Sequence, residues 1–177
     1  ETAEVILIED GSTDNSVNLC KSLEQKHDKV KLLIHENNLN KGAAESRTVG
    51  IRKAKCDFVA FLDADDYFLD NRFKKTIEVF NQYPDADGVY EAIEARFENI
   101  SDEKSWLEKG KSLITSVNKK IEPKDLFEHL LFGTAGYFSG DGLTVKKSIF
   151  DKSGMFNSDM TIAEDTHMWL KMSIVGK

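Results

Sequence analysis

Short apolar runs alternate with helical patterns through the first half of the chain, and this alternation restricts the possible folds more than any other feature. Four apolar runs predict strands, at Val5–Ile8, Val30–Ile34, Phe58–Leu62 and Gly88–Phe97. Helical spacing of apolar residues fills the intervals, and one such helix is predicted at Ala43–Ala54. Strands joined by helices of this length form right-handed βαβ crossovers. The sequence therefore predicts an α/β fold with a mixed, mainly parallel sheet and helices on both faces.

The second half of the chain is less regular. Residues 99–120 are polar and charged, which is typical of an excursion over the surface. Pro123 is placed to begin a helix that runs to Phe132, and four glycines follow between Gly133 and Gly142. The last regular pattern predicts a helix at Ala163–Val175 with Trp169 and Met172 facing inward.

Composition limits the classes of protein to which this chain can belong. Its 177 residues, of which 40% are hydrophobic, are enough for one substantial core. The formal net charge of −7 argues against binding to a nucleic-acid backbone. No apolar run approaches the roughly 18 residues that a membrane-crossing helix needs. We therefore expect a single domain with no nucleic-acid partner and no transmembrane segment.

Three carboxylates follow the predicted strand Phe58–Leu62, in the stretch Asp63-Ala-Asp-Asp66. Carboxylates this close together repel one another unless a cation neutralises them. Mg²⁺ is often held by one or two carboxylates together with substrate phosphates. The stretch is therefore consistent with a metal–diphosphate site, and equally with a capped turn at the start of a helix, where Asp is common.

A second polar turn, Glu9-Asp10-Gly11-Ser12, follows the strand Val5–Ile8. In parallel sheets ligands bind at the carboxyl ends of strands, which places both acidic turns at the same edge. An ordinary strand-to-helix turn explains Gly11 and Ser12 but not Glu9 and Asp10. A carboxylate at this position can accept a hydrogen bond from the N–H of a nucleobase. Arg47, on the helix Ala43–Ala54, has small neighbours and is free to reach the same region.

Taken together and in order, these stretches resemble the family-2 glycosyltransferases, which have the GT-A fold. The segment VILIEDGSTDNS (5–16) resembles the strand and uridine-binding turn of that family, and Lys41–Ala54 resembles its glycine-rich, Arg-containing helix. FLDADD (61–66) resembles the metal-binding Asp-x-Asp motif. Gly142–Phe156 and the Glu-Asp pair within 163–170 resemble the acceptor-side segments. The matching stretches span most of the chain.

The resemblance implies a role for particular residues. Asp10, and with it Glu9, would contact the nucleotide base, and Arg47 would lie near the base or the diphosphate. Asp63 would approach the ribose, and Asp65 would bind Mn²⁺ or Mg²⁺. The general base would be Asp165 with Glu164 as its neighbour, and the remaining nucleotide-binding positions of the motifs would be Ser12 and Ala64.

The chain also departs from the family pattern. Glu9 stands where the family often has Asp, and Thr48 stands where Asn usually follows the Arg. We expect residues 1–177 to form one catalytic domain that lacks its first strand and a C-terminal extension. Its nucleotide-binding half would be 1–97 and its acceptor-binding half 98–177. The segment Met168–Met172 lacks the Gln-x-x-Arg-Trp of polymerising members, which implies transfer of a single sugar.

The implied function is inverting transfer, of the hexosyltransferase type, from a nucleoside diphosphate sugar, typically a UDP-sugar. The acceptor would be a saccharide or a lipid-linked glycan in polysaccharide or cell-envelope synthesis. The implied location is the cytoplasm, including peripheral association with the inner face of the membrane; the oligomeric state is open. Two alternatives are a sugar-phosphate nucleotidyltransferase, which also combines a nucleotide, a metal and paired Asp residues, and a nucleotide-sugar-binding domain without turnover.

Overall fold

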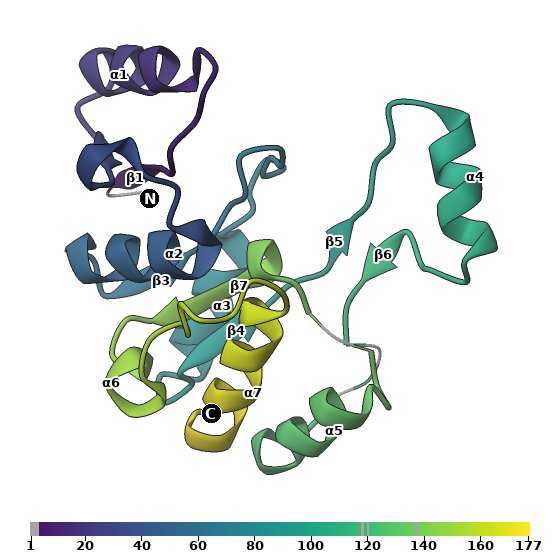
Figure 1. The fold of residues 1–177 in the computed structure, drawn as a ribbon. Helices are drawn as coiled ribbons and strands as arrows, with labels where there is room; N and C mark the ends of the chain where they lie inside the picture. The colour runs from purple at the N-terminus through teal and green to yellow at the C-terminus, as the bar shows by residue number, and fades with distance from the viewer. Residues whose placement is uncertain (1–3, 118, 120, 137) are drawn as a thin grey trace. The chain divides into compact units, whose positions relative to one another are not determined.

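The computed structural model describes residues 4–117, 119, 121–136 and 138–177, and these form a mixed α/β chain (Figure 1). The chain divides into two compact units. Unit 1 comprises Glu1–Val59 and Lys146–Met172, and unit 2 comprises Ala60–Val145 and Ser173–Lys177. None of the helices in the described ranges is long and apolar enough to cross a membrane.

Unit 1 begins with a βαβ arrangement. Strand β1 (Val5–Glu9) pairs in parallel with β2 (Val30–Ile34), in a register that places Val5 opposite Val30 and Glu9 opposite Ile34. Parallel neighbours need a crossover connection, and helix α1 (Ser16–Lys26) supplies it. The expected strand–helix–strand alternation is therefore confirmed here.

Helix α2 (Gly42–Lys53) follows a short 3-10 turn, η1 (Glu36–Asn38), and packs on β1. It buries Ala44, Thr48 and Ile51, which helical spacing places on one face. A side chain at Gly50 would lie 3.7 Å from the Ile8 Cδ1 atom, so the helix and strand are in close contact. This packing fixes the position of Arg47 relative to the turn after β1.

The rest of unit 1 comes from the second half of the chain. Helix α6 (Ile149–Ser153) is followed by α7 (Glu164–Val175), whose described buried residues are Met168, Trp169 and Met172. The inward orientation predicted for Trp169 and Met172 is confirmed. Phe156 packs edge-on against Trp169, with ring centroids 5.9 Å apart, and together they form part of the core beside α7.

Most of unit 2 lies between β3 and β7. Its regular elements are α3 (Lys74–Gln82), β4 (Gly88–Tyr90), β5 (Ile93–Glu94), α4 (Ile100–Glu108), β6 (Ile114–Thr115), η2 (Pro123–Asp125), α5 (Leu126–Phe132) and η3 (Gly140–Gly142). β5 and β6 pair antiparallel, and α4 connects them at the end of this ribbon (Figure 1). The Asn99 side chain caps α4 by accepting from the Asp102 amide. The polar excursion at 99–120 thus contains a capped helix in its described part.

The prediction of a mixed, mainly parallel sheet is confirmed only in part, because the described strands form small sheets that are partly antiparallel. The three-stranded sheet has the order β3 (Phe58–Ala60), β7 (Leu143–Lys146), β4, and β4 runs antiparallel to β7. The strand predicted at Gly88–Phe97 is two short strands, because β4 pairs with β7 whereas β5 turns away to pair with β6. Coverage of both sheet faces by helices stays a prediction.

Candidate active site

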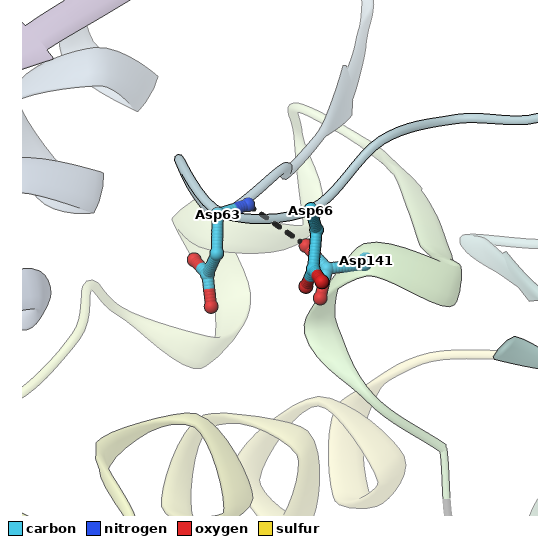
Figure 2. Close-up of side chains that lie close together, drawn as sticks. All are labelled: Asp63, Asp66 and Asp141. Carbon is cyan, nitrogen blue, oxygen red and sulfur yellow. Dashed lines mark hydrogen bonds between the residues drawn. The ribbon is translucent and has the colours of Figure 1, made fainter. Parts of the chain in front are cut away.

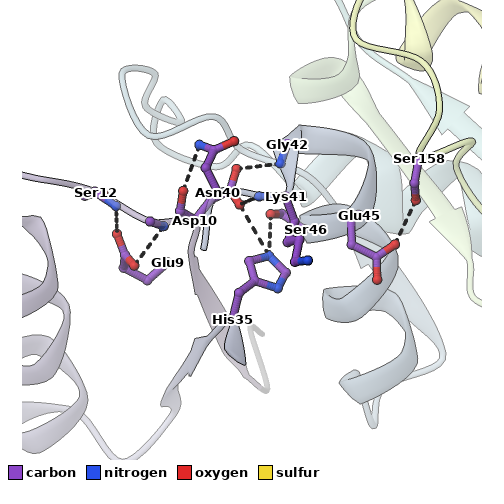
Figure 3. A network of polar contacts seen from close by, with 11 residues as sticks. Glu9, Asp10, Ser12, His35, Asn40, Lys41, Gly42, Glu45, Ser46 and Ser158 are labelled. Carbon is purple, nitrogen blue, oxygen red and sulfur yellow. Dashed lines mark hydrogen bonds and ion pairs between the residues drawn. The ribbon is translucent and has the colours of Figure 1, made fainter. Parts of the chain in front are cut away.

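The turn after β1 is organised by the buried Glu9 side chain, which is 3% exposed. Its two carboxylate oxygens accept from the backbone amides of Gly11, at 3.0 Å, and Ser12, at 2.6 Å (Figure 3). A hydrogen bond from the Ser12 side chain, together with these amides, holds the pKa of Glu9 below its ordinary value, although burial acts in the opposite direction. The structure therefore explains Glu9 as the group that shapes this turn.

Asp10 ties the same turn to the start of α2. Its Oδ1 accepts from the Lys41 amide at 2.6 Å and its Oδ2 from the Gly42 amide at 3.0 Å (Figure 3). A carboxylate at a helix N-terminus satisfies amides that have no partner within the helix and complements the helix dipole. The Asn40 side chain donates to the Asp10 carbonyl at 2.8 Å. Both acidic residues of the turn thus have structural partners, and their nucleotide contacts stay predictions.

His35 is part of this network and was not singled out by the sequence. Its Nε2 atom lies 2.9 Å from the Ser46 Oγ atom and 3.5 Å from the Asp10 Oδ1 atom. The His35 side chain is only 9% exposed, so it is held between β2 and α2. Gly11 is required nearby, because its φ of 80° is left-handed and a Cβ there would lie 2.6 Å from the Asn40 nitrogen.

Arg47 and Glu164, which the sequence places in different functional sets, form an ion pair. The Arg47 Nη1 atom lies 2.8 Å from the Glu164 Oε1 atom, and the two side chains are 17% and 16% exposed. The Arg47 guanidinium also lies over the Phe156 ring, 5.8 Å from its centroid. The structure therefore joins the helix predicted to bind the nucleotide to the motif predicted to supply the base.

The Glu164-Asp165 pair begins helix α7, and the residue before it has an unusual backbone. Ala163 has φ of 59°, a left-handed conformation that costs a non-glycine residue about 1–3 kcal/mol. The half-buried Asp165 accepts through Oδ1 from the Thr166 amide at 2.6 Å and from the Thr166 hydroxyl at 3.3 Å. The dipole of a 12-residue helix favours carboxylates at this end.

A group of three carboxylates forms in unit 2, at the turn after β3 (Figure 2). One oxygen from each of Asp63, Asp66 and Asp141 lies within 4.8 Å of the others. The Asp63 amide donates to the Asp141 Oδ1 atom at 3.0 Å, and the Asp66 amide closes the turn on the Asp63 carbonyl at 3.1 Å. Ala64 and Asp65 are exposed in the same turn. Within the described ranges, Asp65 is not a member of this group.

Asp141 is the half-buried member of the group, whereas Asp63 and Asp66 are exposed. Burial, and then the nearby charges of Asp63 and Asp66, raise the pKa of Asp141 to about 6, although the hydrogen bond from the Asp63 amide opposes the change. Close carboxylates favour a bound proton or a bound cation. Three carboxylate oxygens are a donor set that suits a hard divalent ion such as Mg²⁺ or Mn²⁺. The residues present therefore fit the metal that the family resemblance implies.

The position of Asp141 is set by Arg72 and Gly142. The Arg72 Nη2 atom donates to the Asp141 carbonyl at 3.1 Å, while Nη1 pairs with the Glu91 carboxylate at 3.0 Å. The Glu91 amide donates to the Gly142 carbonyl at 2.8 Å, and a Cβ on Gly142 would clash with the Glu91 carbonyl. Sequence reasoning missed Asp141 as a candidate ligand, and its one signal was its place between two glycines, Gly140 and Gly142.

The described residues define a mixed α/β protein, with a carboxylate cluster in the turn after β3 and a carboxylate pair at the start of α7. The family model described as Glycosyl transferase family 2 matches residues 1–154. The chain therefore belongs to glycosyl transferase family 2, as the resemblance implied.

The relatives that match this chain are themselves described as glycosyltransferases. An uncharacterized glycosyltransferase of Haemophilus influenzae is 28% identical over 169 residues, covering 96% of this chain and 51% of that protein. Glycosyltransferase GlyG of Streptococcus pneumoniae is 36% identical over 89 residues, covering 50% of this chain and 29% of GlyG. The chain thus spans about half of the first relative and less of the second.

The crystal structure of TarS residues 1–349 from S. aureus superposes on this chain with a TM-score of 0.66 at 20% identity. The match covers 96% of this chain and 45% of the TarS chain. At this identity the likeness concerns the fold alone, and it supports the expected GT-A architecture. The roles predicted for individual residues remain predictions.

Proposed function

We propose that this chain carries out inverting transfer of a single sugar, of the hexosyltransferase type, from a nucleoside diphosphate sugar, a UDP-sugar in the first instance. The acceptor would be a saccharide or a lipid-linked glycan of polysaccharide or cell-envelope synthesis, met on the cytoplasmic side of the membrane. Family membership supports the reaction class. The observation that carries the proposal is the carboxylate group of Asp63, Asp66 and Asp141, which suits a divalent ion beside a diphosphate.

The metal would be held by members of the 63–66 turn together with Asp141. The family resemblance assigns Asp65, whereas the carboxylate positions favour Asp63, Asp66 and Asp141. When bound, a divalent ion stabilises the negative charge of a departing diphosphate. Arg72 contributes indirectly, because its hydrogen bond to the Asp141 carbonyl holds that residue in place.

The proton of the acceptor would be taken by Asp165. As the acceptor hydroxyl oxygen attacks the anomeric carbon, its proton moves to the Asp165 carboxylate. The bond from the anomeric carbon to the diphosphate oxygen breaks with its electron pair on the diphosphate, and the anomeric configuration inverts. Glu164 would keep its ion pair with Arg47 during this step. Glu9, Asp10 and Ser12 would shape the turn that receives the nucleotide, as their hydrogen bonds already organise it.

A product assay tests this proposal against the alternatives. The protein is incubated with Mn²⁺ and a panel of UDP- and other nucleotide sugars, with and without candidate glycan acceptors. Release of nucleoside diphosphate that depends on both metal and acceptor is the expected result. Release of pyrophosphate from a sugar phosphate and a nucleoside triphosphate would instead identify a nucleotidyltransferase. Donor binding without any product would identify a binding domain, and either outcome would overturn the proposal.

A further inference from the structure

We propose that Arg47 is a positioning residue for Asp165, which it holds in place through Glu164, and that it does not contact the nucleotide. The proposal rests on the proposed function, in which Asp165 takes the proton of the acceptor. It gives Arg47 a different role from the nucleotide contact that its motif implies. All three residues lie in unit 1, on helices α2 and α7.

The first observation is the ion pair itself. The Arg47 Nη1 and Glu164 Oε1 atoms are 2.8 Å apart, and both side chains are more than four-fifths buried. A buried pair is weakly screened by salt, and removing one partner leaves the other charge in a poorly solvated place. The pair therefore fixes the carboxylate of Glu164 far more firmly than a surface ion pair would.

The second observation is that the guanidinium of Arg47 is itself held in place. It lies over the face of Phe156, and Phe156 packs edge-on against Trp169 of α7. Both aromatic side chains are buried, at 5% and 4% exposure. A row of contacts thus leads from α2 through Phe156 to α7, and it ends one helical turn beyond Asp165. A second tie joins the same segments, because the Ser158 hydroxyl donates to the Glu45 carboxylate at 2.7 Å (Figure 3).

The third observation is the backbone of Ala163, which precedes the pair. Its left-handed φ of 59° is unfavourable for alanine and persists only where the surrounding contacts outweigh the strain. The ion pair at Glu164 acts on the very next residue. Without it, the strained turn is free to relax, and the Asp165 carboxylate moves with the first turn of α7.

Such a movement affects turnover more than binding. A displacement of about 1 Å at a reacting group can lower the rate about 100-fold. Arg47 touches Glu164 in this structure, and in the proposal its effect on the proton transfer passes through Glu164. The expected signature is a loss in kcat without a loss in nucleotide affinity.

The test is a double-mutant cycle with Arg47→Met, Glu164→Gln and the double variant. Each single variant is expected to lower kcat roughly 10- to 100-fold. The double variant should have about the same kcat as the less active single variant, because both changes break the same interaction. The dissociation constant of UDP with Mn²⁺, measured by calorimetry, is expected to stay within about twofold of wild type. Arg47→Lys keeps the charge and is expected to recover part of the rate. Glu45→Gln, which removes the other tie between the segments, is the matched control and keeps most of the rate.

Two kinetic results would overturn the proposal. Weaker UDP binding in Arg47→Met but not in Glu164→Gln would indicate that Arg47 contacts the nucleotide, as its motif implies. Multiplicative losses in the double variant, or an unchanged kcat in either single variant, would show that the pair does not act as a unit on Asp165.

A spectroscopic measurement separates this proposal from the proposed function. The chain has two tryptophans, so 5-fluorotryptophan labelling gives two ¹⁹F resonances, and Trp106→Phe assigns the one from Trp169. Arg47→Met and Glu164→Gln are both expected to shift or broaden the Trp169 resonance in the same direction and to leave that of Trp106 unchanged. An unchanged Trp169 resonance would overturn the positioning role even for an active enzyme. Absence of sugar transfer by the wild-type protein would overturn the proposed function instead.

Discussion

The acidic residues Glu9, Asp10 and Glu164 in unit 1 and the acidic cluster Asp63, Asp66 and Asp141 in unit 2 occupy opposite electrostatic environments. Glu9 and Asp10 accept from four backbone amides, and Glu164 pairs with Arg47. Asp141 lies half-buried against Asp63 and Asp66. The pKa of Glu9 is lowered and that of Asp141 is raised to about 6. The carboxylates of the first set thus hold the backbone and a helix start in place, whereas those of the second set concentrate negative charge in one cluster.

The groups around each acidic motif decide whether it is a candidate for metal binding. Glu9-Asp10-Gly11-Ser12 and Asp63-Ala-Asp-Asp66 look alike in sequence, since both place carboxylates after a strand. They differ in the donors that the fold brings to them. A carboxylate surrounded by N–H groups is stabilised as an anion without a cation, whereas neighbouring carboxylates favour a proton or a metal ion.

The largest expected effect concerns Asp165. Asp165→Asn keeps the size of the side chain but cannot take a proton, so transfer should fall by roughly 10²–10⁴-fold, as for a lost general base. Nucleotide affinity should survive, because the donor is bound elsewhere in the proposal. A turnover assay paired with a UDP titration checks this, with Asp159→Asn, an exposed position nearby, as the control. Wild-type turnover in Asp165→Asn would show that Asp165 is not the base and only stabilises the start of helix α7.

A medium effect is expected at Glu9, whose hydrogen bonds stabilise the folded state only while it is ionised. Because its folded pKa is lowered from the ordinary value of 4.5, this stability is fully present above that pH and is lost as the pH falls through the folded pKa. Glu9→Gln should cost about 1 kcal/mol near neutral pH and flatten the loss of stability on acidification. Urea unfolding between pH 3 and pH 7 measures both. Parallel pH curves for the two proteins would contradict the framework role of Glu9.

The smallest expected effect concerns the backbone of Ala163. Glycine adopts the left-handed conformation without strain, so Ala163→Gly should leave stability unchanged or raise it by up to about 1 kcal/mol. A thermal melt of both proteins provides the measurement. A clear loss of stability would mean that the strained turn is not a cost in the folded state. The matched change Ala54→Gly, just after α2, should lower stability instead because its φ is negative.

Local features of the fold could be predicted from the sequence. The bounds of β2 agree with the prediction at both ends, and α2 begins one residue early and ends one residue early. These elements depend on apolar periodicity and on neighbouring residues. Sheet pairing did not follow, because the position of β7 beside β4 joins segments more than 50 residues apart, and periodicity contains no information about such partners.

In the candidate site, too, the sequence predicts local features but not contacts between distant residues. The acidic turns were recognised because their carboxylates are adjacent in sequence. The role of each turn depends on hydrogen-bond partners that are distant in sequence. Lys41 and Gly42 lie 31 and 32 residues beyond Asp10, and Asp141 lies 78 residues beyond Asp63. A sequence pattern names a carboxylate as a candidate, but only the fold determines whether amides or other carboxylates surround it.

The most direct test of this contrast is the Mn²⁺ dependence of UDP binding in three variants: Asp141→Asn, Asp65→Asn and Asp10→Asn. We expect wild type to bind UDP at least tenfold more tightly with Mn²⁺ than with chelator. Asp141→Asn should lose most of that difference while remaining folded, because it removes a charged member of the cluster. Asp65→Asn decides whether the motif residue is a ligand as well. Asp10→Asn should lower stability but keep the Mn²⁺ dependence. Full Mn²⁺ dependence in Asp141→Asn, or its loss in Asp10→Asn alone, would contradict the assignment of the metal to the unit 2 carboxylates.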